Sequence, residues 1–335
     1  MTNSQPVSVG TDQDTIPRAA TPKIDPKDAG ADLDIDAVLD DYPIILANKT
    51  RQGVFEPPPK WWPWWEKSFF GPARRNLAKY TSQGWLDSRF RTSPADPPYM
   101  PDQFLLGAPF ALSAFLSTLG TWDGRDPTHP IHSLAKSTLL DKFAASHSLL
   151  ARQGHTVTLS VSKTKSDPEV KDIFISFGPE SVIQSTLTEG TVLKRYNPNS
   201  FVKASKEGRG KHGYLIFREV TFEYALKEKD VEGWEDQMPG LGPRARSMQT
   251  GAVVGVDVSC DVELKVEVRK GGDEGRLGTL VTSEKVDKVL EFRLESDHFE
   301  GKKVSPEGFW RVADVDRLLI SDRVREEEKW FDRQE

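Results

Sequence analysis

Acidic residues and histidines recur at every third position in one stretch of the chain, and metal chemistry would need these residue types. The set is Asp123, Asp126, His129 and His132. Carboxylate and imidazole groups bind metal ions when a regular backbone brings them together. Here Pro127 and Pro130 prevent a regular helix, and the spacing matches no known zinc motif. We therefore expect a solvated loop and predict no metal or other cofactor.

Two further features could carry chemistry. Residues 206–213 are rich in glycine and basic side chains, and their backbone amides could surround a phosphate. They lack the order of a P-loop and precede an expected strand, so we interpret them as a hairpin tip. The single cysteine, Cys260, excludes a disulfide framework and a cysteine-based zinc site, and it indicates a reducing compartment. No nucleophile lies beside a base in the sequence, which favours a protein without catalytic activity.

Aromatic and basic residues gather in residues 57–91, in a segment that we call the aromatic–basic arm. Its most prominent members are Trp61, Trp62, Trp64, Trp65, Phe69, Phe70, Arg74 and Arg75. Prolines between the indoles favour an extended path that points them in several directions. Exposed tryptophans followed by cations suit a partner protein, structural RNA or an anionic membrane surface. The alternative is that these indoles fold back onto the core of their own domain.

Residues 103–122 contain no charged side chain. Their length reaches the lower limit for a membrane span, but Gly107, Pro109 and several hydroxyl residues dilute the apolar character. We expect a buried helix, with burial at a membrane interface as the alternative. A second helix is predicted to begin at Ser133 as its N-cap and to end before Gly154, with His147 hydrogen-bonded in the core.

The clearest strand signal lies in residues 252–268. Valine, leucine and cysteine side chains occupy one parity there, and Asp, Ser, Glu and Lys occupy the other. Successive strand side chains point to opposite faces, so this strand should bury one face and expose the other, as antiparallel sheets do. Further strands are expected at residues 157–161, 173–177, 214–226 and 309–315, and one strand or a pair of strands is expected at 280–294. A turn is predicted at Asp167 and Pro168, and a long loop is predicted from residue 227 to about residue 248. The fold class is therefore α+β, a curved antiparallel sheet with helices packed on one face.

Composition divides the chain into four parts. We predict a disordered acidic segment at 1–31, the Pro/Trp-rich and basic region at 32–101, an α+β domain at 102–321 and a charged helix end at 322–335. A proline-studded linker at 92–102 is expected to join the second part to the third. The net charge of −6 and pI near 5.7 argue against DNA binding, since nucleic-acid binders are basic over their contact face.

The closing strands, Val289 to Arg293 and Gly308 to Val312, together with the arm, carry a family resemblance. The chain resembles the Tim44-like domain of the NTF2-like superfamily, found in an import-motor subunit and in mitochondrial ribosome–membrane adaptors. The resemblance implies a cone-shaped sheet, a protein or ribonucleoprotein partner, peripheral membrane contact and a place on the matrix side of the mitochondrial inner membrane. Since the N-terminus is acidic, unlike a matrix presequence, the cytoplasm is the alternative location.

Two functions follow from these expectations. The first is a non-enzymatic adaptor that uses the aromatic–basic arm on a membrane or a large assembly. The second is a small-molecule carrier or enzyme that uses the concave pocket of the sheet, as other NTF2-like proteins do. That pocket would need titratable groups, and the candidates are Tyr224, His298 and Asp314.

Deletion of residues 1–30 should leave the melting temperature unchanged, because a segment without apolar periodicity contributes few contacts. Thermal melts of the full chain and the truncated chain, followed by circular dichroism, measure this directly. A drop of several degrees would mean that the segment docks on the domain.

Overall fold

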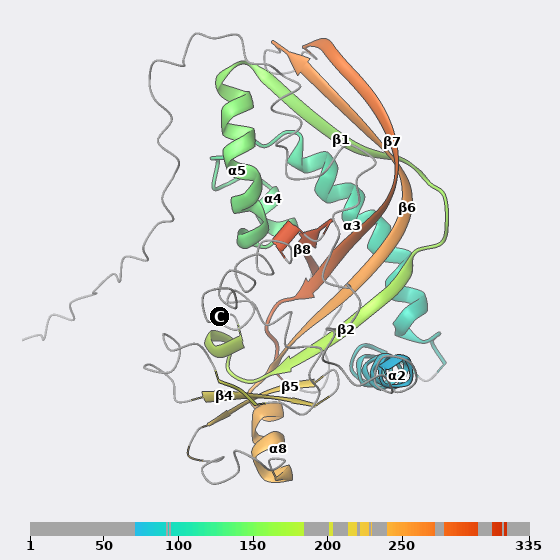
Figure 1. Cartoon of the computed structure of the whole chain (residues 1–335), viewed down its shortest axis with the longest axis vertical. Coiled ribbons are helices and arrows are strands. Elements are labelled where there is room, and N and C mark those ends of the chain that lie inside the picture. The colour runs from blue at the N-terminus through green and yellow to red at the C-terminus, as the bar shows by residue number, and fades with distance from the viewer. Residues whose placement is uncertain are drawn as a thin grey trace, which may run out of the picture.

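The structure is a computed structural model, and it describes residues 71–91, 93, 95–183, 201–203, 214–219, 222–227, 229, 240–271, 278–300, 310–316 and 318–319. The predicted segments at 1–31 and 322–335 and the glycine-rich stretch 206–213 lie outside these residues. The described residues form an α+β fold in which helices pack on a strongly curled sheet (Figure 1). The α+β class and the curved sheet are thereby confirmed.

Strand β6 (Ala252–Lys270) lies at the centre of the sheet and pairs along both edges. One edge carries β7 (Thr279–Ser296) over nearly its whole length, and the other carries β1 (His155–Thr164) and β2 (Glu169–Phe177). The predicted apolar parity is confirmed, since Val262, Leu264 and Cys260 are at most 2% exposed. Burial raises the pKa of the Cys260 thiol to about 11, so this cysteine stays protonated and unreactive.

The two early strands do not form a hairpin with each other. A turn was predicted at Asp167 and Pro168, but β1 and β2 follow one another along the same edge of β6, both antiparallel to it. Between them, the backbone N–H of Lys165 donates to the carbonyl of Asp261 at 2.8 Å, which keeps the interrupted strand on its partner. The turn signal therefore marks an irregularity within one long edge.

The sheet is mixed, so the prediction of a purely antiparallel sheet was wrong. Strand β5 (Phe222–Lys227) pairs in parallel with β2, and β4 (Tyr214–Glu219) and β3 (Phe201–Lys203) follow outward from it. The single strand predicted at 214–226 is a tight hairpin, in which Phe217 lies opposite Tyr224. Phe217 and Tyr224 are both buried although one has an odd and the other an even position, and this is why periodicity alone misread the segment. Strand β8 (Trp310–Val315) pairs antiparallel with the end of β7 and completes the order β3-β4-β5-β2-β6-β7-β8.

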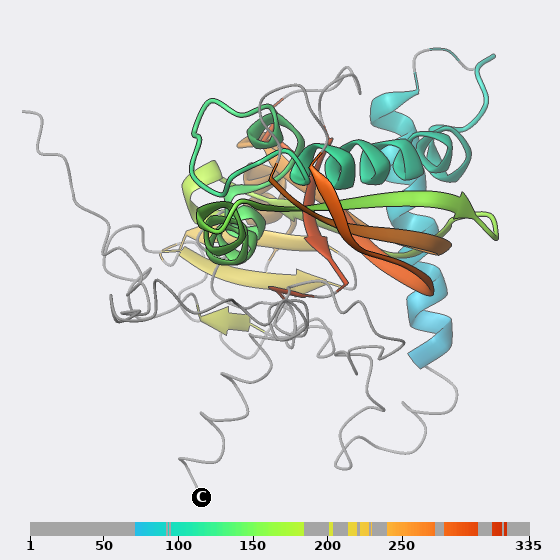
Figure 2. The ribbon, with the colours of Figure 1, turned by 90° about the horizontal axis from the view of Figure 1, so that it is seen from above.

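Helices cover the apolar face of the sheet. Helix α3 (Phe104–Leu119) runs along β1, and α5 (Ser137–Arg152) also contacts β1; Figure 2 shows both helices from above. Every third or fourth residue of α5 is apolar, and its buried residues are Leu139, Leu140, Phe143, His147 and Leu150. Helix α5 begins at Ser137, not at Ser133 as predicted, because the extended Ala135 bridges to Val312 and interrupts the helix after the short α4 (Ile131–Leu134).

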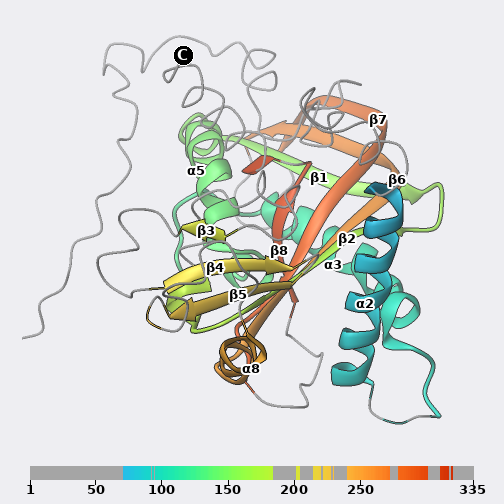
Figure 3. The same cartoon turned by 60° about the horizontal axis from the view of Figure 1, so that its bottom comes forward.

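Two more helices pack at the other end of the sheet. Helix α2 (Gly71–Phe90) contacts β2, and α8 (Leu241–Gln249) packs on β5 (Figure 3). A loop was predicted across residues 227–248, so α8 corrects part of it. The hydrophobic core includes Leu86, Phe90, Tyr99 and Met100, which precede the residue at which the α+β domain was expected to begin.

The polar face of β6 is also covered where the sheet is widest. Arg293 on β7 is 6% exposed and forms two bonds to the Asp257 carboxylate, at 2.6 and 2.9 Å. Burial alone would lower the pKa of Arg293, but Asp257 and the carboxylates nearby outweigh it and raise the pKa. The guanidinium lies 4.9 Å from the ring centre of Phe174, whose edge fills the space where Gly255 lacks a Cβ.

Replacement of Val262 by Asp should lower the free energy of unfolding by about 3 kcal/mol or more, because it places an unpaired charge in the core. The matched control is Val281→Asp on β7, where the side chain is 45% exposed and the change should cost at most about 0.5 kcal/mol. Urea denaturation of both variants measures the difference. Equal stability of the two variants would contradict the assignment of the buried face.

Candidate interaction surface

Helix α2 carries the end of the aromatic–basic arm and is fixed to the sheet at several points. The ammonium of Lys79 donates to the carbonyl of Val170 on β2 at 2.8 Å. Trp85 packs edge-on against Phe177 at a ring-centre distance of 5.5 Å. At the end of the helix, Phe90 is 3% exposed and joins the core. These contacts hold α2 in one orientation on the domain.

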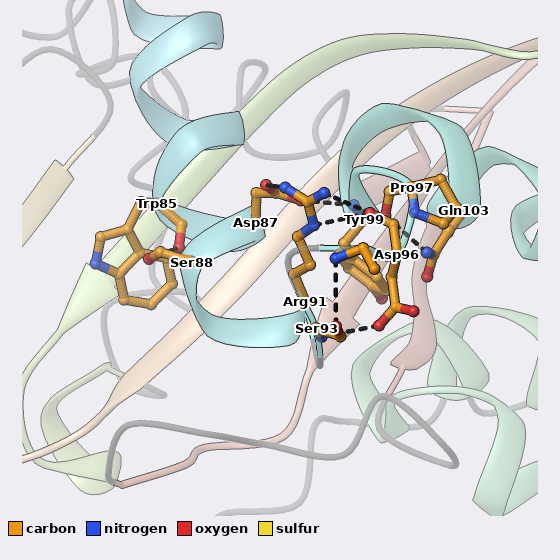
Figure 4. A network of polar contacts seen from close by, with 10 residues as sticks. Trp85, Asp87, Ser88, Arg91, Ser93, Asp96, Pro97, Tyr99 and Gln103 are labelled. Carbon is orange, nitrogen blue, oxygen red and sulfur yellow. Dashed lines mark hydrogen bonds and ion pairs between the residues drawn. The ribbon is translucent and has the colours of Figure 1, made fainter.

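A polar network fixes the turn that follows α2 (Figure 4). The Asp87 carboxylate accepts the backbone N–H of Tyr99 at 2.6 Å and pairs with Arg91 at 3.7 Å. Arg91 Nε donates in turn to the carbonyl of Asp96 at 2.9 Å, and the Asp96 carboxylate accepts the N–H of Ser93 at 2.8 Å. The stretch predicted as a linker is therefore a hydrogen-bonded turn that sets how α2 meets the next helix.

Aromatic packing closes the same turn onto the domain. Tyr99 and Met100 of the kinked turn η3 (Tyr99–Gln103) are buried, and Tyr99 stacks on Phe90 at 4.9 Å. The indole N–H of Trp310 on β8 donates to the Tyr99 hydroxyl at 2.8 Å. Burial raises the pKa of Tyr99 to about 12, with the bond from Trp310 opposing it, so the phenol stays protonated. The residues predicted to connect the arm are thus part of the core.

Helix α3 is buried on one side, as predicted, but its outer face is apolar and exposed. Leu106 and Phe110 are 73% and 76% exposed and stand one turn apart. Gly107, Ala114 and Ser117 are the other exposed residues of this face. No charged residue occurs between Asp102 and Asp123, so the outer face of α3 is an uncharged apolar patch on a helix whose other side is packed. Large exposed apolar side chains in one patch are typical of binding surfaces.

Six of the eight predicted partner-binding residues precede the described part of the chain, and two lie in α2. Trp61, Trp62, Trp64, Trp65, Phe69 and Phe70 lie outside the described residues. Arg74 and Arg75 belong to the first turns of α2. Because α2 begins at Gly71, the chain leads from the tryptophans directly into a helix that is anchored to the sheet and, through η3, to α3.

The three residues proposed for a pocket serve structural contacts. Tyr224 is 6% exposed and stacks on Phe177 at 5.4 Å. The imidazole Nε2 of His298 lies 2.9 Å from the carbonyl of Gly178. Both therefore adjoin the end of β2. Asp314 lies instead on β8, in register with Arg293, and its carboxylate accepts the N–H of Leu319 at 3.1 Å. No contact joins these three side chains into one catalytic arrangement within the described part of the chain.

The Asp and His side chains of residues 123–132 form hydrogen bonds within their own loop. Asp123 Oδ1 accepts the backbone N–H groups of Asp126 and Arg125. Asp126 Oδ1 accepts the hydroxyl of Thr128 at 2.7 Å and the backbone N–H of the same residue at 2.8 Å. These bonds lower the pKa of both carboxyl groups. Among the residues that the structure describes, no three His, Cys, Asp or Glu side chains gather as metal ligands. The loop is a set of capped turns.

His147 fits the prediction of a core histidine. It is 4% exposed, and its Nδ1 lies 2.9 Å from the carbonyl of Trp122. Burial lowers the pKa of His147, although this bond opposes the shift, so the ring is neutral at physiological pH. The contact of His147 with Trp122 joins α5 to the segment that follows α3.

Sequence reasoning did not find the exposed pair Leu106 and Phe110. Residues 103–122 are apolar on all sides of the helix, so their periodicity does not say which face is covered. In the described part of the chain, no helix is both long and apolar enough for a membrane crossing.

Comparison of the chain with protein-family models and with curated proteins gives no match.

Replacement of Asp87 by Ala should lower the free energy of unfolding by about 1–3 kcal/mol, since it leaves the Tyr99 N–H without its charged acceptor. Asp141→Ala on the exposed side of α5 is the control and should change stability by at most about 0.5 kcal/mol. Urea denaturation monitored by tryptophan fluorescence measures both. An unchanged Asp87 variant would show that the turn after α2 is held by its aromatic packing alone.

Proposed function

We propose that this protein is a non-enzymatic adaptor, which attaches to a large protein or ribonucleoprotein assembly at a membrane surface. The aromatic–basic arm and the outer face of α3 form its binding region. The observation that carries the proposal is the pair Leu106 and Phe110, which are exposed on a helix whose opposite side is packed in the core. An aromatic and an aliphatic anchor of this kind are typical of interaction hot spots.

The construction of the binding region supports this function. The Asp87 and Tyr99 contacts join α2 to η3 and α3, so α2, which is the last part of the arm, and the apolar face of α3 belong to one packed unit. A rigid unit loses less conformational entropy on binding than a flexible one, which favours affinity. Arg74 and Arg75 add cations next to the tryptophans, as attachment to an anionic lipid or RNA surface requires.

The resemblance to Tim44-like adaptors suggests the partner. On this proposal the curled sheet is an NTF2-like cone, and the assembly is the mitochondrial ribosome or the import machinery on the matrix side of the inner membrane. The carrier or enzyme alternative needs free titratable groups in the concavity. Tyr224, His298 and Asp314 are engaged in packing and hydrogen bonds, which is the reason we favour the adaptor.

The double variant Leu106→Ser, Phe110→Ser should bind its assembly at least ten-fold more weakly while it keeps its melting temperature, because both side chains are exposed. Leu241→Ser is the matched control, since Leu241 is 80% exposed on α8, away from the binding region. Co-sedimentation with mitochondrial ribosomes and with liposomes of inner-membrane composition measures association, and thermal melts report folding.

The arm is tested in the same assay. Serine at Trp61, Trp62, Trp64 and Trp65 should abolish association without loss of stability, and alanine at Arg74 and Arg75 should weaken it most at low salt. Undiminished sedimentation of both the α3 variant and the tryptophan variant would refute the adaptor function. Loss of stability in the tryptophan variant would assign the indoles to the core.

A further inference from the structure

The outer face of α3 has a large half and a small half. Leu106 and Phe110, in the first half of the helix, are 73% and 76% exposed. In the second half, the outward positions belong to Ala114 and Ser117, which are also exposed. The face therefore carries two bulky side chains at one end and leaves room for two bulky side chains at the other.

The spacing along this face is typical of a helix that packs against another helix. Its exposed residues Gly107, Phe110, Ala114 and Ser117 stand three, four and three positions apart. Residues with this spacing form one narrow seam along a helix, and a second helix can lie along that seam. Large side chains of one helix then enter the spaces beside small side chains of the other.

The charges around α3 favour a protein helix over a lipid surface as the partner. No charged side chain occurs from residue 103 to residue 122, so a charge on the partner would lose its water here without gaining an opposite charge. The first charges beyond the two ends are Asp102 and Asp123, which are both exposed. Anionic lipids would repel these carboxylates. The partner that fits is an uncharged apolar helix.

A second copy of α3 meets these requirements when it runs antiparallel to the first. The midpoint of α3 lies between residues 111 and 112, so two copies that overlap along the whole helix cross there. This register places Phe110 opposite Ala114 of the second copy and Leu106 opposite Ser117 of the second copy. The large half of each copy then faces the small half of the other, and two-fold symmetry makes this contact twice.

Other pairings fit this face less well. A parallel pair of helices would place Phe110 against Phe110 and leave a gap between the two small halves. Leu280 and Val281 on β7 are another exposed apolar pair, but they share their strand with Glu284 and Lys285. Those charges would lose water against α3 without a partner. The antiparallel copy of α3 therefore matches the face in both shape and charge.

The size of the contact predicts a weak dimer. A helix of 16 residues is about 24 Å long and about 10 Å wide. Two such faces bury less than the roughly 800 Å² per partner that is usual in a stable complex. The two copies should therefore separate readily, and their association should depend on concentration.

We propose that two copies of this chain associate antiparallel through the outer faces of α3, with Phe110 of each copy packed on Ala114 of the other. The dimer covers the apolar face in the free protein. Dimerisation and attachment to the assembly then exclude each other, because both use this face. That exclusion rests on the proposed function, whereas the dimer itself does not.

The test exchanges size between the two halves of the face. Ala114→Phe sets two large side chains against each other at both contacts, and Phe110→Ala leaves a gap at both. Each variant should therefore dimerise at least ten-fold more weakly than the wild type. An equimolar mixture should restore association, because the heterodimer again sets one large side chain against one small one at each contact. The double variant Phe110→Ala, Ala114→Phe should dimerise on its own for the same reason.

Sedimentation equilibrium across a concentration series measures every sample in the absence of any assembly, and circular dichroism checks that each variant is folded. Leu241→Ser on α8 is the control and should dimerise as the wild type does. Loss of the dimer in this control would place the contact on α8 and overturn the proposal.

Each remaining outcome also decides the proposal. Restored association in the mixture and in the double variant supports it, since only the antiparallel register predicts both. Single variants that dimerise as strongly as the wild type overturn it, and so does a mixture that stays monomeric. A wild type that is monomeric at every concentration overturns it too and leaves the adaptor function standing. Flotation of that monomer with liposomes of inner-membrane composition would then assign the face to lipid.

Discussion

The backbone ladder along β6 is the constraint on which the rest of the structure depends. This strand of 19 residues holds β7 on one edge and the interrupted β1–β2 pair on the other. A strand of that length twists, so its neighbours curl with it and the two ends of the sheet face different surroundings. The apolar parity of β6 then dictates the face on which α3 and α5 pack, since the buried residues of all three elements belong to one core.

The two ends of the sheet differ in how completely they are covered. At the wide end, β5, β2 and β8 extend the sheet, and even the polar face of β6 buries the Asp257–Arg293 pair against Phe174. A buried ion pair is costly unless its bonds are complete, and here the two bonds are bidentate. At the narrow end, the strands of the described residues are β1, β6 and β7 alone, so among these residues backbone groups and apolar side chains are left at the edge.

The surfaces available for binding follow from this unequal cover. Helix α3 covers β1 with one of its sides, and only that side is buried by the contact. Because the helix is apolar all round, its opposite side is also apolar. Its other side, with Leu106 and Phe110, is left to solvent or to a partner. The Asp87 network and the Trp310–Tyr99 bond then fix the turn between α2 and α3, and so they fix α2 relative to α3. The packing of the core therefore determines where the proposed binding region lies.

Local pattern in the sequence was sufficient for the central strand, the burial of Cys260, the core role of His147 and the α+β class, because each depends on side chains a few residues apart. Tertiary structure alone decided the parallel pairing of β2 with β5, the hairpin that divides residues 214–226, and the burial of Arg293. It also decided which face of α3 is exposed. These features depend on partners far away in the chain, and the periodicity of one segment contains no information about which partner covers it.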